Sequence, residues 1–154
     1  TDMTKSSNKR NVFYQAQAIL SRRDHAEAEM RQKLNNKGFS GEEVQEAVDW
    51  LYEKKLLNDE AFAKAYAASI LRSKPVGPRW IEAKLRQRGV GSQDIETAIQ
   101  EIYENHSEIS LAREAAGKWR ALHPNKENAR QKLQFHLAQR GFSSHAISEA
   151  LANA

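Results

Sequence analysis

The chain of 154 residues contains no cysteine, which excludes a structural disulfide and a zinc site built from thiolates. No apolar run approaches the roughly 18 residues of a membrane-spanning helix, and no signal-peptide pattern is present. The lack of cysteine is compatible with a reducing compartment. Together these absences predict a cytoplasmic protein with no membrane partner.

Motifs for catalysis and cofactor binding are also missing. The sequence has no GxxxxGK[ST] phosphate-binding loop, and Gly89–Gly91 is too short for a dinucleotide fingerprint. No two of the five histidines have i, i+4 spacing, which argues against a zinc site. Adjacent carboxylates such as Glu42 and Glu43 fall at expected helix starts, where capping and the helix dipole account for them. We therefore expect no enzyme, cofactor or bound metal.

One glycine recurs three times at nearly equal intervals. Gly38, Gly89 and Gly141 are separated by 51 and 52 residues. A cation precedes each glycine, an apolar residue follows it, and two more apolar residues stand four and eight positions before it, which is helical spacing. These last residues are Leu34, Leu85 and Leu137, and Met30, Ile81 and Leu133. Internal repetition of this kind predicts three copies of one module.

Each copy of the module is predicted to contain three helices. An amphipathic helix ends in a basic turn, a glycine in the left-handed conformation and an apolar residue that folds back on it. The next helix starts at once, since Ser40 and Glu43 have the spacing of a capping box. A further helical stripe, such as Val12, Ala16 and Ile19, precedes each pair. The sequence therefore predicts nine helices.

The predicted fold is an elongated, all-α array of three tandem three-helix repeats. Repeats of roughly 50 residues can stack in a row, and a mean hydropathy of -0.78 leaves wide solvated faces between modest cores. Stacked repeats also cover one another's apolar faces, so we expect a monomer. The expected parts are a flexible N-terminal tail at 1–10, and repeats at 11–57, 58–105 and 106–154.

Charges are sorted by helix, although the net charge is only +4. Residues 72–88 contain six cations and one acid, and residues 113–140 contain seven cations and two acids. By contrast, 40–53 and 91–108 each contain five acids and no cation. If like helices line up, the molecule has one basic and one acidic flank.

Two interpretations of the basic flank remain open. Ordinary solvated helix faces would explain Arg88, which stands in a last turn, but not the absence of cations from the acidic helices. As a binding surface, the flank would present Arg79 and Arg86 on one side of their helix and Lys84 on the other, beside Trp80. Phosphates and protein carboxylates would both suit such a surface.

Phe135 has two interpretations as well. It lies nearly opposite Leu133 and Leu137 on its helix. We expect it to pack against the first helix of its repeat. The alternative is an exposed anchor for a partner.

Three stretches of the chain resemble the RecX family, over about residues 11–151. They are the Arg-Asp-His run at 23–25 with the positions that follow to Gly38, Leu-Leu-Asn-Asp-Glu-Ala-Phe-Ala at 56–63, and Val-Gly-Pro-Arg-Trp-Ile at 76–81 through Gly89. The chain departs from the family pattern at Lys55, usually Gly, at Asn58, usually Asp, and in the turn 74–76. These departures change loops and one cap, and Asn58 can cap as Asp does.

RecX proteins are bacterial modulators of the RecA recombinase. The resemblance implies a curved helical array that lies in the groove of the RecA filament on single-stranded DNA and spans neighbouring protomers. It also implies opposition to filament growth, strand exchange, ATP hydrolysis and coprotease action, and so an influence on recombination and the SOS response. The residues expected to make electrostatic contacts are Arg72, Lys74, Arg79, Lys84, Arg86, Arg130 and Lys132.

Two other classes of function remain open from the residues alone. Three-helix units also occur as helix-turn-helix modules with a basic recognition helix, so the chain could bind single- or double-stranded DNA without RecA. That class predicts a steep salt dependence with DNA alone. A scaffold for a different protein would use the basic flank for solubility and would have no effect on RecA.

Overall fold

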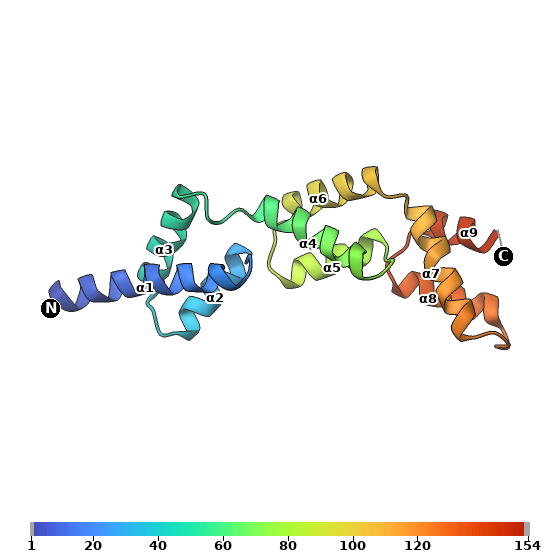
Figure 1. Cartoon of the computed structure of the whole chain (residues 1–154), viewed down its shortest axis with the longest axis horizontal. Coiled ribbons are helices and arrows are strands. Elements are labelled where there is room, and N and C mark those ends of the chain that lie inside the picture. The colour runs from blue at the N-terminus through green and yellow to red at the C-terminus, as the bar shows by residue number, and fades with distance from the viewer. Residues whose placement is uncertain (1, 153–154) are drawn as a thin grey trace.

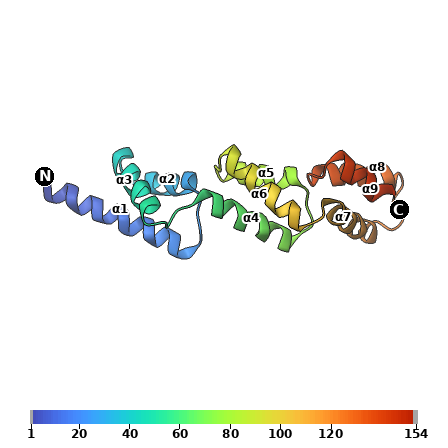
Figure 2. The same ribbon diagram turned by 90° about the horizontal axis from the view of Figure 1, so that it is seen from above.

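The computed structural model describes residues 2–152, and these form nine α-helices without any strand (Figure 1). The helices are α1 (Asp2–Arg22), α2 (Glu27–Asn36), α3 (Gly41–Glu53), α4 (Asp59–Ser73), α5 (Pro78–Gln87), α6 (Ser92–Asn105), α7 (Glu108–Leu122), α8 (Ala129–Gln139) and α9 (Ser144–Ala152). They form three successive three-helix repeats in an elongated row, as both views show (Figure 2). The predicted all-α repeat fold is confirmed.

Each repeat encloses its own hydrophobic core. Buried side chains form one cluster in each of the three helix triplets, and the extensive helix–helix contacts lie within the triplets. The six apolar residues that stand four and eight positions before the repeat glycines are at most 1% exposed. Ala26 is an exception to the separation, because it belongs to the first repeat but packs into the core of the second. The molecule is thus a chain of small cores with narrow junctions.

The repeat glycines end the middle helices as the sequence predicted. Gly38, Gly89 and Gly141 have φ angles of +94°, +80° and +86°, in the left-handed region. The residue after each glycine donates its backbone N–H to the carbonyl of the leucine four positions before that glycine, at 3.4, 3.1 and 3.3 Å. This hydrogen bond turns the chain back toward its own repeat, so the next helix begins against the same core.

Two helix starts are capped by the expected side chains. At α3, the Glu43 N–H donates to Ser40 Oγ at 3.1 Å, and the Ser40 N–H donates to the Glu43 carboxylate at 2.9 Å. At α4, the Ala61 N–H donates to Asn58 Oδ1 at 3.1 Å. Asn58 therefore caps its helix, as expected for a replacement of the family's Asp.

The N-terminal segment differs from its prediction. Residues 1–10 were expected to form a flexible tail, whereas α1 begins at Asp2. Val12 of α1 is fully buried in the core of the first repeat. Once part of a helix has formed, further turns add at little cost, so a helix can extend beyond the residues whose spacing predicts it. Residue 1 of the expected tail lies outside the described residues.

Like helices line up along the molecule. Figure 1 shows α3 and α6 along its upper edge, and α5 and α8 along its lower edge. The acidic segments 40–53 and 91–108 thus lie on one flank, and the basic α5 and α8 lie on the other. Within residues 2–152, no helix combines the length and apolar character needed to cross a membrane.

Candidate functional site: a basic surface on the middle helices

The indole ring of Trp80 gathers three cations from separate elements. Lys74 Nζ, at the end of α4, lies 4.2 Å from the ring centroid. Arg140 Cζ, at the end of α8, lies 5.2 Å from it, and Lys84 Nζ on α5 lies 5.3 Å from it. The negative face of an indole attracts cations, which holds these side chains together. We call Lys74, Lys84, Arg140 and Trp80 the Trp80 cluster.

The cations of the Trp80 cluster repel one another. Desolvation by burial, followed by the charges of Arg140 and Lys84, lowers the pKa of the Lys74 ammonium. Among the described residues, no carboxylate forms an ion pair with any of the three cations. An anionic group supplied by a partner would relieve this repulsion.

Backbone contacts between the second and third repeats fix the Trp80 cluster. The N–H groups of Gly77 and Arg79, at the start of α5, donate to the carbonyls of Arg140 and Gly141 at 2.9 and 3.1 Å. No side chain caps this helix, so these carbonyls take the place of a cap. A Cβ on Gly141 would clash with the backbone of Trp80. This close approach places Arg140 beside the indole ring.

The loop before α5 is held equally firmly. Pro75, Val76 and Gly77 are buried, and Tyr103 Oη on α6 donates a hydrogen bond to the Val76 carbonyl at 2.8 Å. Burial raises the pKa of Tyr103, so its hydroxyl remains a donor at neutral pH. The turn in which the sequence departs from the family pattern is therefore well packed, and it positions Lys74.

Of the seven predicted contact residues, only Lys74 and Lys84 share a contact, which is the Trp80 ring. The prediction that Lys84 lies beside Trp80 is confirmed. Arg140 joins the pair although it was not among the seven. The sequence showed only that Arg140 precedes a repeat glycine. Because sixty positions separate Arg140 from Trp80, spacing did not predict their contact.

Arg79 and Arg86 differ in availability. The Arg79 side chain is exposed and has no ion pair among the described residues. Arg86 is exposed too, but its guanidinium pairs with Glu82 at 3.0 Å, one turn earlier on α5. The i, i+4 spacing of Glu82 and Arg86 was visible in the sequence. A partner must therefore compete with Glu82 for Arg86 but meets Arg79 directly.

The three remaining predicted residues lie on α4 and α8. Arg72 and Lys132 are exposed and have no ion pair within the described part of the chain. Arg130 has a contact inside the protein, because its Nη1 donates to the Leu151 carbonyl near the end of α9 at 3.3 Å. A cation at a helix C-terminus is stabilised by the helix dipole, so Arg130 also has a structural role.

Phe135 is 65% exposed, so the expectation that it packs against α7 is wrong. Leu133 and Leu137, which are 1% and 0% exposed, occupy the inner face of α8. A residue two positions from both must point away from that face. The alternative of an exposed aromatic side chain on α8 is thus the one that the structure supports.

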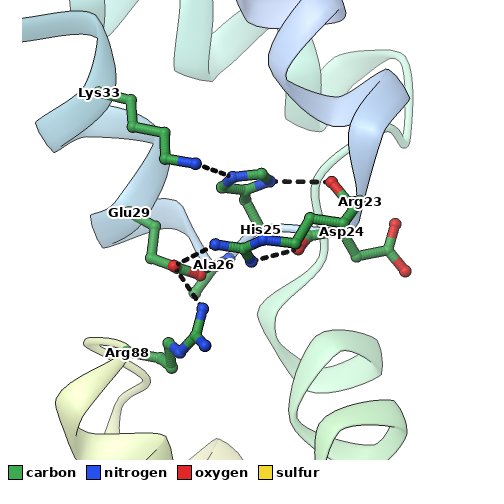
Figure 3. A network of polar contacts seen from close by, with 7 residues as sticks. All are labelled: Arg23, Asp24, His25, Ala26, Glu29, Lys33 and Arg88. Carbon is green, nitrogen blue, oxygen red and sulfur yellow. Dashed lines mark hydrogen bonds and ion pairs between the residues drawn. The ribbon is translucent and has the colours of Figure 1, made fainter.

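The junction between the first and second repeats depends on charged side chains (Figure 3). Glu29 Oε2 on α2 accepts from Arg88 of the second repeat at 2.7 Å and from Arg23 at 3.0 Å. Burial opposes ionisation of Glu29, but hydrogen bonds from Arg23, the Ala26 N–H and Arg88 outweigh it and lower the pKa of this carboxyl. The Glu27 N–H donates to Asp59 Oδ1 at 2.8 Å across the same junction. Charged side chains and the packing of Ala26 thus hold this junction, whereas backbone hydrogen bonds join the second and third repeats.

No group of three or more His, Cys, Asp or Glu side chains suited to a metal ion occurs in the described part of the chain.

Comparison with known proteins covers nearly the whole chain. Family models for the first, second and third three-helix domains of RecX match residues 14–51, 58–99 and 108–151. The regulatory protein RecX of Prosthecochloris aestuarii is 34% identical over 145 residues, which is 94% of either chain. That of Chlorobium limicola is 37% identical over 134 residues, which is 86% of this chain and 82% of the relative.

Two solved structures have the same fold. A crystal structure of regulatory protein RecX, 24% identical, superposes with a TM-score of 0.90 over 99% of this chain and 77% of the other. The crystal structure of RecX from Lactobacillus salivarius, 20% identical, gives a TM-score of 0.87 over 96% of this chain and 97% of the other. At this identity the similarity concerns the fold.

Proposed function

The chain belongs to the RecX family of regulatory proteins, and on that premise we propose that it binds the RecA filament on single-stranded DNA and restrains RecA. The match to all three RecX domains, in order along one chain, is the observation that carries this proposal. Restraint would extend to ATP hydrolysis, strand exchange and coprotease action, and so to recombinational repair and the SOS response.

The arrangement of charge supports a ligand that contacts two kinds of surface. The basic flank, with α5 and α8, suits phosphates of DNA or carboxylates of RecA. The acidic flank, with α3 and α6, suits cationic protein surfaces. An elongated monomer of three repeats can reach neighbouring protomers of a filament, whereas a globule of the same mass would reach fewer.

The contact residues that we propose fall into three groups. Lys74 and Lys84, together with Arg140, form a preorganised cation cluster around Trp80. The exposed cations Arg72, Arg79 and Lys132 add long-range attraction. Arg86 and Arg130 contribute less, because each already has a partner in the protein.

The first test measures the single-stranded-DNA-dependent ATP hydrolysis of RecA with increasing amounts of this protein. Binding of the protein to the same DNA without RecA is measured in parallel. Inhibition at protein concentrations well below those that coat bare DNA is expected. Inhibition only when the DNA is already saturated, or none at all, would contradict the proposal.

DNA binding without RecA is the second candidate function. The observation that favours it is the Trp80 cluster, since unpaired cations beside an aromatic ring are typical of surfaces for single-stranded nucleic acid. In that case affinity for DNA alone would fall steeply with salt, by a slope that reflects the number of phosphates contacted. RecA would then add nothing to the binding.

A further inference from the structure

A half-open cavity of about 510 Å³ lies in the first repeat, between the last turns of α1 and of α2. Its walls come from α1, from the linker after α1 and from the end of α2. The volume falls within the range of small-molecule sites. The cavity shares no residue with the Trp80 cluster, and Arg23, His25 and Lys33 of its wall belong to the first stretch that resembles the RecX family.

The wall of this cavity carries four cations and no carboxylate: Arg22, Arg23, Lys33 and Lys37. Of these, only Arg23 has a carboxylate partner, Glu29, within the described residues. Positive charge on several sides of a concave surface raises the local potential and attracts anions. The other three cations therefore remain available to a ligand.

A buried histidine orients one of these cations. His25 is 3% exposed, and its Nδ1 lies 2.8 Å from the Arg23 carbonyl, which can only accept. Nδ1 therefore carries the proton, and Nε2 accepts from the Lys33 ammonium at 2.6 Å, as Figure 3 shows. An ammonium has three N–H groups, so two N–H groups of Lys33 remain for a ligand.

We propose that this cavity binds a phosphate-bearing ligand. Arg22, Lys33 and Lys37 supply the charge that a phosphate requires, and the amides of Gln15 and Asn36 on the same wall can donate to its oxygens. Ala18 and Ile19 add an apolar strip that fits the remainder of a nucleotide. The source of the phosphate is either a free nucleotide or the backbone of a nucleic-acid strand.

Calorimetric titration of the full chain distinguishes these sources. The probes are pyrophosphate, ADP and a short single-stranded oligothymidylate, with citrate as a non-phosphate anion. Saturable binding of pyrophosphate or ADP at one site per chain identifies a free phosphate ligand. Binding of the oligothymidylate alone identifies a strand. Either result supports the site if the double variant described next binds the same probe more weakly.

The test variant is Arg22→Gln with Lys37→Gln. Both side chains are exposed and have no ion pair in the described part of the chain, so the fold should persist. Loss of two charge-assisted contacts should weaken binding by about tenfold or more. Lys118→Gln with Lys126→Gln removes the same charge from exposed positions of the third repeat and should leave binding in this cavity unchanged.

Three results would overturn the inference. They are no saturable binding of any phosphate probe, equal affinity in the Arg22→Gln, Lys37→Gln variant, and citrate binding as tight as that of pyrophosphate. Melting temperatures of both double variants, measured alongside, separate loss of the site from loss of the fold. None of these measurements involves RecA, so the inference can fail while the proposed function holds.

Discussion

The backbone N–H of Arg79 donates a hydrogen bond to the carbonyl oxygen of Gly141 at 3.1 Å, and this contact joins the start of α5 to the turn after α8. The Gly77 N–H makes a parallel contact with the Arg140 carbonyl at 2.9 Å. Neither bond depends on a titratable side chain. Neither salt nor pH therefore directly alters these two bonds between the second and third repeats.

The preceding junction is of another kind, because Glu29 holds Arg88 through side-chain charges. Screening and charge substitutions act on such pairs. The two junctions should thus respond differently to mutation, which the first two predictions test.

Gly141→Ala should destabilise the protein by about 2 kcal/mol or more, because it combines an unfavourable positive φ with a clash against Trp80. The matched control is Gly38→Ala. Gly38 has a similar φ of +94° but nothing within 4 Å of an added Cβ, so only the backbone cost of about 1 kcal/mol applies. Urea unfolding measures both. Equal losses would show that the close approach contributes nothing.

Glu29→Gln and Arg88→Gln should show a coupling free energy of about 1 kcal/mol in a double-mutant cycle. The Glu29 and Arg88 side chains are 16% and 32% exposed, so water screens them only in part. Glu82 with Arg86 is the control pair, at 41% and 55% exposure. That pair should couple by about 0.3–0.5 kcal/mol. The prediction fails if the control pair couples as strongly.

Lys74→Glu with Lys84→Glu should weaken inhibition of RecA by about tenfold or more, since two unpaired cations of the Trp80 cluster become acids. The melting temperature should hardly change. Arg79→Glu with Arg86→Glu should act in the same direction. Inhibition curves for the RecA ATPase measure the effect.

Lys118→Glu provides a control with the same change of charge at one site. Lys118 lies on α7, is 61% exposed and pairs with Glu114. It should leave inhibition nearly unchanged. If Lys118→Glu reduces inhibition as much per charge as the Lys74 and Lys84 substitutions, net charge rather than the Trp80 cluster is responsible.

Acidification from pH 7.5 to 5.5 should lower the free energy of unfolding. Burial is the main cause that lowers the pKa of His25 below 6.5, and the nearby charges of Arg23 and Lys33 lower it further. The hydrogen bond to the Arg23 carbonyl and the charge of Glu29 oppose this shift without cancelling it. The unfolded chain then binds more protons than the folded one, so stability is complete above about pH 6.5 and falls below it.

His25→Gln should reduce this pH dependence, because the amide does not titrate and its oxygen can still accept from Lys33. His136 should supply part of the remaining slope, since burial and the charges of Arg140 and His123 lower its pKa as well. Urea unfolding at both pH values measures the difference. An unchanged slope in the His25→Gln variant would assign the dependence to other groups.

Phe135→Ser should change the free energy of unfolding by no more than about 0.5 kcal/mol, because the side chain is 65% exposed. Leu137→Ala, on the buried face of the same helix, should cost about 2–5 kcal/mol. Weaker RecA inhibition by Phe135→Ser at unchanged stability would identify it as a contact residue. A large loss of stability would contradict the exposure of this ring.

Local interactions let the sequence alone determine the helices, their ends and the residues of each core. Three such features depend on neighbours within about eight positions, so spacing predicted them all. They are the left-handed conformation of Gly38, the capping box of Ser40 and the burial of Met30. The order of family motifs likewise fixed the family. The exception is the predicted flexible tail. Residues 2–10 have no periodic apolar pattern, so the sequence did not predict that α1 begins at Asp2.

The tertiary structure decided which of the many cations have partners. Arg140 reaches Trp80, and Arg88 reaches Glu29, across junctions that join residues about sixty positions apart. The cavity beside His25 depends in the same way on the packing of α1 against α2. Helical spacing places a side chain on a face but says nothing about what the next repeat brings to that face. Packing within and between repeats therefore determined the charged clusters, the exposure of Phe135 and the candidate binding sites.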